Sequence, residues 1–370
     1  MKILYVTTVS DTMGFFTSHI KMLLEEGHTV DMTCNIDKPI NQELIDLGCN
    51  AYNIEFSRSP SSPSNIKAYK KLRKLIMEKE YDIVHTHTPV ASVCVRLACK
   101  KLNNVRVIYT AHGFHFFKGA AIKNWLVFYP IERLLSRYTD VLITINKEDY
   151  NIAIKKFNTK KVEYIPGVGL NTKKINELIV DKSMKRKEMG IPNDAIILLS
   201  VGELNKNKNH ETVIKALAKI ERSNIYYIIC GRGPLEQHLQ DLIVKLNVDK
   251  NVQLLGFRTD ILEICKAVDI FIFPSYREGL PVSIMEAMAC ELPVICSDIR
   301  GNTDLVANGK GGYTVKSGNI DEYVSCITIL IDDPQEREYF GKVNKADIVK
   351  FSNENVLNEL LKIYQKVKLY

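Results

Sequence analysis

Short apolar runs alternate with helical segments along this chain, and this alternation constrains its fold more than any other feature. A first series of runs, typical of buried strands, lies at 3–7, 30–34, 83–86, 105–110 and 141–145. A second series of the same character lies at 196–201, 226–230, 252–255, 270–273 and 294–296. Helices are expected between the runs, for example at 15–26, 65–79 and 121–137. Continuous apolar strands separated by helices predict an α/β protein with doubly wound parallel sheets.

The length of the chain predicts two such units. Its 370 residues exceed the size at which a single hydrophobic core stops growing. The turn-forming sequence Pro-Gly-Val-Gly at 166–169 separates the two series of runs. We therefore expect one domain over residues 1–170 and a second over residues 171–350. The last segment, 351–370, has the pattern of an amphipathic helix that Ser352 can cap.

Composition and cysteine usage indicate a cytoplasmic protein. Apolar residues make up 46% of the chain and charged residues 25%, as is ordinary for globular proteins. No apolar run approaches the roughly 18 residues of a membrane-spanning helix, and the N-terminal apolar run is too short for a signal peptide. The nine cysteines lie in apolar segments without a C-x-x-C pair, so we expect buried, reduced thiols.

The positive charge of the chain is confined to its first half. Residues 1–170 carry 23 Lys and Arg against 16 Asp and Glu, whereas residues 171–370 carry 27 of each. Part of the excess lies on the expected helix at 65–79, on Lys70, Lys71, Arg73 and Lys74. This face is either simply solvated or attracted to anionic lipid, where a cation near the surface contributes on the order of 1 kcal/mol. Nucleic acid is a weaker alternative, because no binding motif accompanies the charge.

Two glutamates bracket a helix start in the sequence Glu-Gly-Leu-Pro-Val-Ser-Ile-Met-Glu at 278–286. Pro281 suits the first helical position, and the apolar residues after it recur at near-helical spacing. The free N–H groups and partial positive charge of such a terminus favour a diphosphate at 279–283. Glu278 would then reach a sugar and Glu286 a ribose. The alternative is that Glu278 only complements the helix dipole and Glu286 only faces solvent.

Together with five other segments, this motif resembles the donor-binding signature of glycosyltransferase family 4. The segments follow the order and spacing of that family, and they are 201–210, 230–233, 252–257, 269–275 and 297–301. The resemblance covers nearly the whole chain, is strongest over residues 196–315, and looks most like the bacterial capsule, exopolysaccharide and O-antigen transferases. It implies the GT-B fold, in which two Rossmann-like domains face each other across a cleft and the C-terminal helix crosses back to the first domain.

The resemblance also implies roles for individual residues. Lys208 matches the diphosphate-binding lysine of the family, His112 matches a histidine that contacts the transferred sugar, and Glu278 is expected to bind a sugar hydroxyl. These three are the predicted catalytic residues. Backbone groups at 256–258 are expected to read a uracil base. The predicted donor-binding residues are Gly14, Gly202, Lys208, Gly231, Phe257, Arg258, Gly279, Leu280, Pro281, Val282, Glu286 and Arg300.

Each of these residues has a simpler alternative. Taken alone, Lys208 would be a solvated charge, a histidine at a strand end is usually structural, and Gly-Arg-Gly at 231–233 marks a tight turn. Their positions after predicted strands favour ligand contact, because open α/β sheets bind ligands outside the carboxyl ends of their strands. His85 and His87 also follow a strand. Without a third ligand at suitable spacing, they are expected to be acceptor-side groups or core histidines rather than metal ligands.

Two positions depart from the pattern of the family. Many relatives have an arginine where this chain has Glu203, so Arg300 or Lys206 would have to balance the second phosphate charge. The expected loop at 7–14 contains only Gly14 where a double glycine is usual, which leaves its contact with the phosphates open.

Together with the resemblance, which implies retention of the anomeric configuration, these features predict a glycosyltransferase that moves a hexose or an N-acetylated amino sugar from a UDP-sugar. The expected acceptor is a polyprenyl diphosphate-linked saccharide at the inner face of the membrane, for surface polysaccharide. No D-x-D motif occurs, so neither a metal nor a cofactor is expected. A covalent intermediate would need a carboxylate close beneath the sugar. We expect same-face substitution instead, with the departing phosphate helping to deprotonate the acceptor. The alternatives are an isomerase like UDP-N-acetylglucosamine 2-epimerase and a non-catalytic sugar-nucleotide-binding protein.

Overall fold

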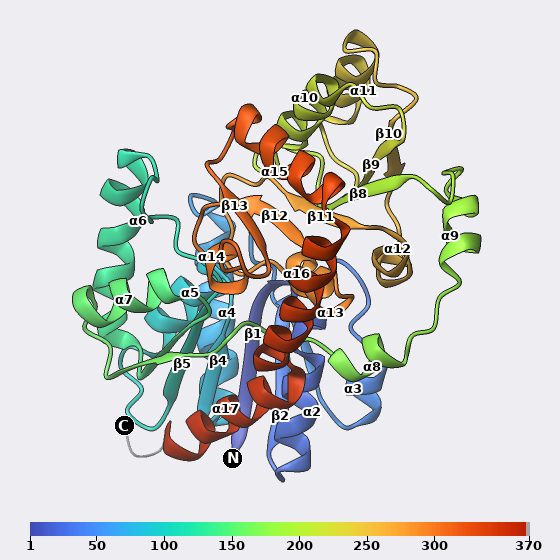
Figure 1. Cartoon of the computed structure of the whole chain (residues 1–370). Helices are drawn as coiled ribbons and strands as arrows, with labels where there is room; N and C mark the ends of the chain where they lie inside the picture. The colour runs from blue at the N-terminus through green and yellow to red at the C-terminus, as the bar shows by residue number, and fades with distance from the viewer. Residues whose placement is uncertain (368–370) are drawn as a thin grey trace. The chain divides into compact units, whose positions relative to one another are not determined.

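The computed structural model describes residues 1–367, which form two compact units. The first unit consists of residues 1–169 and the segment that starts at Asn353, and the second consists of residues 170–352. The boundaries predicted from the sequence are 170 and 350. Figure 1 shows each unit as a sheet with helices packed around it. No helix within residues 1–367 is long and apolar enough to cross a membrane.

The first unit is built on a seven-stranded sheet in the order β3-β2-β1-β4-β5-β6-β7. All its neighbouring strands are parallel. Its strands are β1 (Lys2–Val9), β2 (Thr29–Asn35), β3 (Ala51–Asn53), β4 (Ile83–Thr86), β5 (Arg106–Ala111), β6 (Val141–Thr144) and β7 (Lys161–Tyr164). The strand order reverses between β1 and β4, so the ends of these two strands frame a crevice of the kind that binds ligands.

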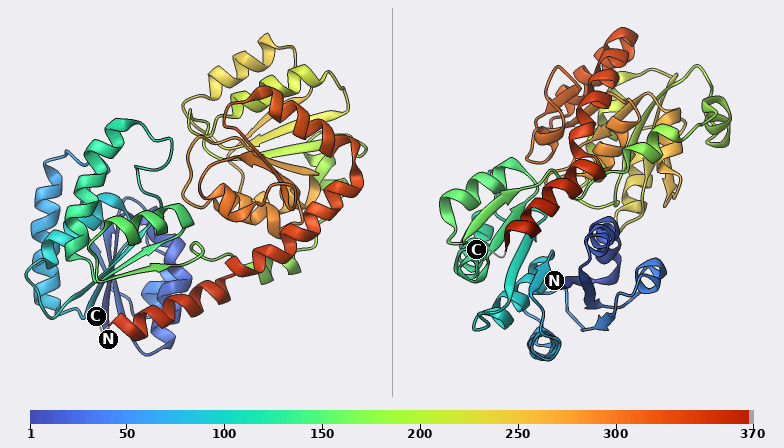
Figure 2. Two further views of the ribbon diagram at one scale, coloured as in Figure 1. Left: turned by 60° about the vertical axis from the view of Figure 1, so that its left-hand side comes forward. Right: turned by 90° about the horizontal axis from the view of Figure 1, so that it is seen from below.

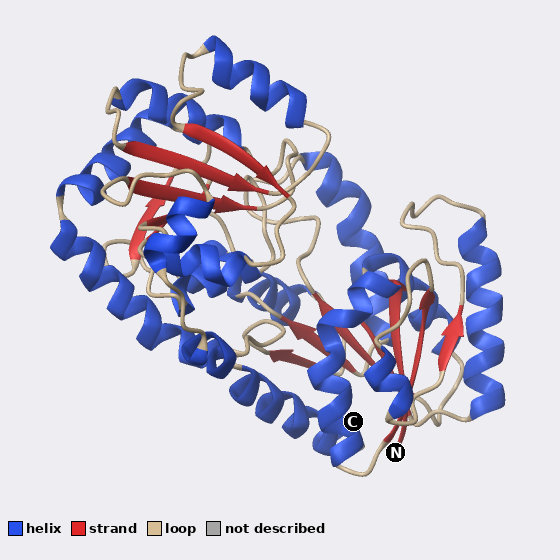
Figure 3. Cartoon of the chain, turned by 90° about the vertical axis from the view of Figure 1, so that its right-hand side faces the viewer, coloured by secondary structure: helices blue, strands red, loops and turns tan. Residues whose placement is uncertain are grey.

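Helices pack on both faces of the first sheet (Figure 3). They are α1 (Ser10–Met13), η1 (Gly14–Phe16), α2 (Thr17–Glu25), α3 (Gln42–Asp46), α4 (Ser64–Lys79), α5 (Pro89–Cys99), α6 (Ile122–Leu135), η2 (Ser136–Tyr138), α7 (Lys147–Lys156) and α17 (Asn353–Lys366). One apolar core joins α2 and α17 to the sheet, and another joins α4 and α5 to it. The α/β architecture predicted from the alternating runs is confirmed.

The C-terminal helix belongs to the first unit. α17 packs against α2 and buries Val356, Leu360, Ile363 and Tyr364, which recur at helical spacing. The hydroxyl of Tyr364 lies 2.6 Å from Nδ1 of His85, so the helix is also tied to β4. Figure 2 shows α17 running alongside the sheet of the first unit. The helix predicted from the sequence extends to 370, and residues 368–370 lie outside the described part of the chain.

The second unit repeats the architecture with a six-stranded parallel sheet in the order β10-β9-β8-β11-β12-β13. Its strands are β8 (Ile196–Val201), β9 (Ile225–Cys230), β10 (Val252–Gly256), β11 (Ile270–Phe273), β12 (Val294–Ser297) and β13 (Gly312–Val315). Its helices are α8 (Thr172–Glu177), α9 (Lys182–Glu188), α10 (His210–Ile220), α11 (Glu236–Lys245), α12 (Ile261–Ala267), α13 (Val282–Ala289), α14 (Asn302–Leu305), α15 (Ile320–Asp332), α16 (Pro334–Asp347) and η3 (Ile348–Phe351). Here the strand order reverses between β8 and β11.

The structure corrects the expected loop at 7–14. β1 continues to Val9, and the next four residues form α1. Two contacts tie this helix to the segment after β2. The Ser10 hydroxyl donates to Asp37 at 2.7 Å, and Nζ of Lys38 lies 2.7 Å from a carboxylate oxygen of Asp11. These side-chain contacts hold the segment that was expected to be a loop.

Candidate active site

Lys208 and Glu278 meet at the switch point of the second sheet. Lys208 lies in the loop after β8, and Glu278 lies in the loop after β11. β8 and β11 are hydrogen-bonded neighbours at the position where the strand order reverses. Their loops therefore leave the sheet on the two sides of one crevice. Both residues were predicted to lie in loops, but their contact with each other was not predicted.

The Lys208 ammonium and the Glu278 carboxylate form a close, mostly buried ion pair. Nζ of Lys208 lies 2.8 Å from Oε1 of Glu278. The same ammonium lies 4.5 Å from the ring centroid of Phe273 at the end of β11, within cation–π range. The backbone N–H of Lys208 donates to the side chain of Asn205 at 3.0 Å, which shapes the loop. The crevice thus holds a cation and a carboxylate in contact, at the carboxyl ends of the strands.

The glycines after β8 and β9 are required by close packing. A Cβ atom on Gly202 would lie 3.1 Å from the stem of Lys208, so the lysine side chain lies against this glycine. A Cβ atom on Gly231 would lie 1.8 Å from the carbonyl oxygen of Gly202, and one on Gly233 would lie 2.5 Å from that of Leu204. Any side chain at these positions would push the β9 loop away from the Lys208 loop. The Gly-Arg-Gly signal therefore marks backbone packing behind the site.

The loop after β12 supports the Glu278 loop from the other side. Nε of Arg300 donates to the backbone oxygen of Glu278 at 3.1 Å, and the arginine is buried. Gly301 has a φ of 79°, and a Cβ atom there would lie 2.3 Å from the carbonyl oxygen of Gly279. Of the two cations expected to balance the second phosphate charge, Arg300 contacts this loop, whereas Lys206 is exposed. The geometry therefore favours Arg300.

Helix α13 begins one residue later than predicted. Pro281 has an extended ψ of 120° and is the N-cap residue, so the first helical residue is Val282. Proline offers no side-chain hydrogen bond to the first turn, so the N–H groups of this turn are not capped by it. Gly279 and Leu280 lead directly into this terminus. The expected anion-binding helix start is therefore present, next to the Lys208–Glu278 pair in the chain.

Glu286 lies in the second turn of α13, in an environment that disfavours its charge. Burial raises the pKa of its carboxyl group from 4.5 to about 7. Within residues 1–367 the carboxylate has no hydrogen-bond or ion-pair partner. Glu286 is half-buried, so its side chain is only partly open to solvent, and its contact with a ribose stays a prediction. A desolvated carboxylate without a partner is a group that a ligand could satisfy.

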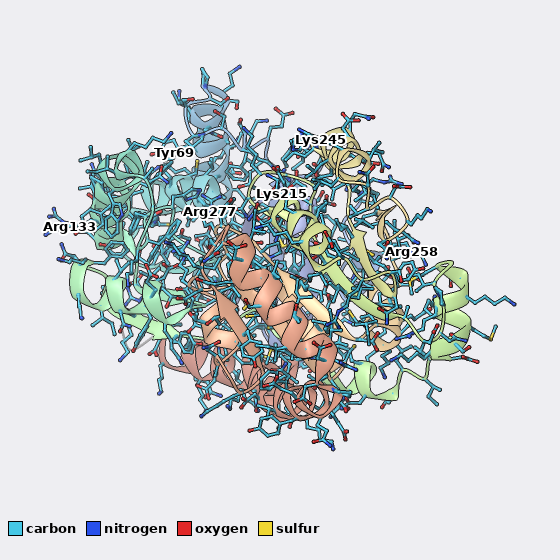
Figure 4. The ribbon with its side chains drawn as sticks, turned by 45° about the horizontal axis from the view of Figure 1, so that its top comes forward. Tyr69, Arg133, Lys215, Lys245, Arg258 and Arg277 are labelled. Carbon is cyan, nitrogen blue, oxygen red and sulfur yellow. The ribbon has the colours of Figure 1, made fainter. Side chains whose placement is uncertain are left out.

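The segment expected to contact the nucleobase follows β10. The side chain of Arg258 is engaged by Asp260 at 2.7 Å and by Glu188 at 2.6 Å, and hydrogen bonding to Arg258 lowers the pKa of Asp260. Figure 4 shows Arg258 at the margin of the second unit. The ring of Phe257 is exposed, and Gly256 adopts a positive φ of 65°. Only the backbone groups of 256–258 and the Phe257 ring remain to contact a base, and their role stays a prediction.

Histidines gather in the first unit where β4 and β5 end. Nδ1 of His87 lies 3.3 Å from Nε2 of His112, and the ring of Phe16 stacks on His87 with centroids 3.8 Å apart. Burial lowers the pKa of His112 and of His19 to about 4, and it also lowers that of His85. The cluster is therefore neutral at physiological pH, and its rings can exchange hydrogen bonds but supply no charge. No pattern in the sequence pointed to His19, a lone histidine in a helical segment.

His85 and His87, which are separated by one residue in the chain, have different hydrogen-bond partners. His85 lies in the core, where Tyr364 and Thr110 hydrogen-bond its two ring nitrogens at 2.6 and 2.8 Å. His87 instead contacts His112. The backbone of Gly14 has an ordinary helical φ of −56°, with open space where a Cβ atom would be. The predicted contact of Gly14 with phosphates therefore has no support in its local conformation.

Two family models match this chain. The model described as "Glycosyl transferase 4-like" matches residues 2–146, and the model described as "Glycosyl transferases group 1" matches residues 181–347. Each match falls within one of the two units. Lys208, Glu278 and Glu286 all lie within the second match.

Relatives and solved structures agree with the family models. The Bacillus subtilis protein EpsD, named as a glycosyltransferase, is 35% identical over 371 residues, which cover 98% of this chain and 96% of that protein. An Escherichia coli protein named UDP-Gal:alpha-D-GlcNAc-diphosphoundecaprenol alpha-1,3-galactosyltransferase is 30% identical over 320 residues, covering 85% of this chain and 82% of that protein. The crystal structure of Anabaena HepE in complex with UDP and glucose has a TM-score of 0.82 at 19% identity, covering 99% of this chain and 100% of that one, which shows the same fold. These findings support neither the isomerase nor the non-catalytic alternative. The chain belongs to the family 4-like glycosyltransferases and has the GT-B fold.

Proposed function

We propose that this glycosyltransferase moves a hexose or an N-acetylated amino sugar from a UDP-sugar to a lipid-linked saccharide, with retention of the anomeric configuration. The Lys208–Glu278 pair at the switch point of the second sheet carries this proposal. A cation suited to a diphosphate touches a carboxylate suited to a sugar hydroxyl, and the uncapped start of α13 follows in the same loop. A sugar nucleotide presents a diphosphate and a sugar side by side, and these protein groups suit those two parts.

Each part of the donor has a proposed partner. The diphosphate accepts hydrogen bonds from the first turn of α13 and from Lys208, with Arg300 adding positive charge behind the loop. The ribose hydroxyls donate to Glu286, which supplies the desolvated carboxylate with the partners it lacks. Glu278 accepts a hydrogen bond from a hydroxyl of the transferred sugar, and the neutral ring of His112 contacts the same sugar.

The proposed reaction needs only the donor and the acceptor. The bond between the anomeric carbon and the diphosphate oxygen breaks, and its electron pair leaves with UDP. The acceptor oxygen bonds the anomeric carbon on the same face, and its proton passes to the departing phosphate. Lys208 and the α13 N–H groups stabilise the charge that develops on that phosphate. Because protein groups meet this charge, we propose that no metal ion takes part.

The name of one relative and the charge distribution of this chain support a lipid-linked acceptor. The Escherichia coli relative is named for a diphosphoundecaprenol-linked acceptor, and the positive charge of this chain lies in its first half. We propose a polyprenyl diphosphate-linked saccharide as acceptor, with the protein held at the anionic inner face of the membrane. Surface polysaccharide is the product class that fits such an acceptor.

A turnover screen tests this function. The purified protein is incubated with a panel of UDP-sugars and lipid-linked acceptors from bacterial extracts, and UDP release is measured. We expect release that requires acceptor and falls strongly in Lys208→Ala, but not in Lys245→Ala, which removes an exposed lysine on α11 (Figure 4). Conversion of one UDP-sugar into another without acceptor, or no turnover with any pair, would contradict the proposal.

A further inference from the structure

We infer that an apolar groove between α5 and α6 binds the isoprenoid chain of the lipid-linked acceptor. This inference rests on the proposed function, because it names where the lipid part of that substrate lies. The groove has a volume of about 230 Å³ and lies entirely within the first unit. Its main apolar lining residues are Val90, Val93, Phe114, Phe116, Val127 and Ile131.

Aromatic and aliphatic side chains make the walls of the groove. The rings of Phe114 and Phe116 stack with centroids 4.9 Å apart, and Phe116 lies 5.4 Å from the ring of Trp125 on α6. The opposite wall comes from α5, where Val90 and Val93 face the groove. Such a surface matches a branched hydrocarbon, and it offers a sugar or a nucleotide few hydrogen-bonding groups.

The acidic residue in the groove is already neutralised. Glu132 lines the groove and accepts from Arg96 at 2.7 Å, and Arg96 is almost completely buried. The guanidinium carbon of Arg96 also lies 4.5 Å from the ring centroid of Tyr109, another lining residue. The groove therefore contains no unpaired carboxylate that would have to lose its hydration when a hydrocarbon binds.

The groove continues onto an apolar surface of α6. The outward face of this helix carries Ile122, Leu126, Val127, Ile131 and Leu134, and the first two are 78% and 71% exposed. A helix on the surface of a soluble domain usually presents a polar outer face. Val127 and Ile131 belong both to this face and to the groove, so one apolar path leads from the helix surface inward. Figure 1 shows α6 projecting at the left of the first unit.

Unpaired cations border this apolar face. They are Lys118, Lys123, Arg133 and Arg137, and none of them forms an ion pair within residues 1–367. Figure 4 shows Arg133 pointing outward at the margin of the unit. Apolar side chains bordered by cations suit a membrane interface with anionic lipids. A second copy of this chain fits less well, because a two-fold contact over this face would bring the same cations of both copies together.

The other end of the groove lies at the loop that carries His112. Gly113 and His115 line the groove, and His112 directly precedes Gly113 in the chain. A lipid whose chain fills the groove therefore brings its head end close to the loop where we propose sugar contact. The groove is smaller than the roughly 300–1,000 Å³ of pockets that enclose drug-sized ligands. It holds the first few isoprene units, and the remainder of the chain would stay in the membrane.

The single tryptophan of the chain makes binding measurable. Trp125 contacts the groove wall, so its fluorescence is titrated with geranylgeranyl phosphate below the concentration at which this lipid aggregates. We expect saturable quenching in the wild type and at least a tenfold weaker affinity in Val127→Asp. The matched control is Leu126→Asp, which places the same charge on the neighbouring exposed position outside the groove lining. Equal affinity in both variants would overturn the inference, as would equal quenching by inorganic phosphate.

Turnover with acceptors of different chain length separates this inference from the proposed function. We expect Val127→Asp to raise the KM for a long-chain acceptor in detergent at least tenfold, and to leave the KM for a short-chain, water-soluble acceptor unchanged. An equal effect on both acceptors would refute the groove and leave glycosyl transfer standing. Absence of turnover with every acceptor would refute the proposed function itself. If Leu126→Asp and Val127→Asp lose vesicle binding equally without a chain-length effect, α6 is only a membrane-contacting face. If the wild type dimerises through α6, this face is an interface between copies of the chain. Either result overturns the inference.

Discussion

Replacing Glu286 by Gln should stabilise the unliganded protein while weakening its binding of UDP. The carboxyl group has a pKa of about 7 in the folded chain against an ordinary value of 4.5, because it is desolvated. A carboxyl group whose pKa is raised on folding holds its proton more tightly in the folded state, so its contribution to stability falls as pH rises from 4.5 to about 7. At about 1.4 kcal/mol per pH unit, the wild type loses up to about 3.5 kcal/mol of stability above pH 7. Glutamine does not titrate and avoids this loss.

Thermal unfolding between pH 4.5 and pH 8.5 measures the effect. The transition of the second unit should move to higher temperature in Glu286→Gln at pH 8, and the two proteins should converge near pH 4.5. Glu177→Gln serves as the control, since it removes an exposed glutamate of the same unit. Equal unfolding temperatures of wild type and Glu286→Gln at pH 8 would refute the desolvation of Glu286.

UDP binding should respond in the opposite direction. A charge-assisted hydrogen bond contributes about 1.5–3 kcal/mol. Glu286→Gln, and more strongly Glu286→Ala, should therefore lower the affinity for UDP by about tenfold or more. The affinity of the wild type should rise between pH 6 and pH 8 as the carboxylate becomes charged, whereas that of the glutamine variant should stay flat. Calorimetric titration with UDP measures both. Unchanged affinity in the variants would show that Glu286 does not bind the ribose.

Three other predictions concern the sugar, the metal and the membrane. Glu278→Gln should lower turnover more than tenfold and leave UDP affinity nearly intact, because its proposed partner is the sugar; an equal loss of UDP binding would contradict that role. Chelator should leave activity unchanged, and strict dependence on added magnesium or manganese would contradict the proposed charge balance. Sedimentation with anionic vesicles should show binding that about 0.5 M salt releases by screening. Replacing Lys70, Lys71, Arg73 and Lys74 with Gln should weaken this binding without unfolding the protein. If the variant binds the vesicles as the wild type does, the basic face of α4 is simply solvated.

The sequence predicted the elements whose apolar pattern is unbroken. Each of the ten apolar runs overlaps a strand, because a strand buried on both faces reads as a continuous apolar segment. β3, β7 and β13 escaped prediction, since they have three or four residues and are only partly buried. Their positions at or near the sheet edges are fixed by backbone pairing, which leaves little trace in composition.

The site was predictable as a set of residues but not as a set of contacts. The motifs placed Lys208 and Glu278 in loops after strands, as the structure has them. That these two loops adjoin depends on strand order, which follows from long-range packing and not from local pattern. The same holds for the burial of Glu286, whose raised pKa arises from the packing around α13. His19 joins His87 and His112 because the ring of Phe16, just before α2, packs against all three.

The contact between Lys208 and Glu278 suggests how donor recognition could be ordered. In the unliganded chain each charge satisfies the other at 2.8 Å, which limits the cost of holding both in a mostly buried crevice. A diphosphate that binds Lys208 competes with Glu278 for the ammonium, and the released carboxylate then needs a hydrogen-bond donor. A sugar hydroxyl attached to the same diphosphate can supply it, whereas UDP alone cannot. Phosphate binding and sugar binding would therefore favour each other, so an intact UDP-sugar should gain more from Glu278 than UDP does.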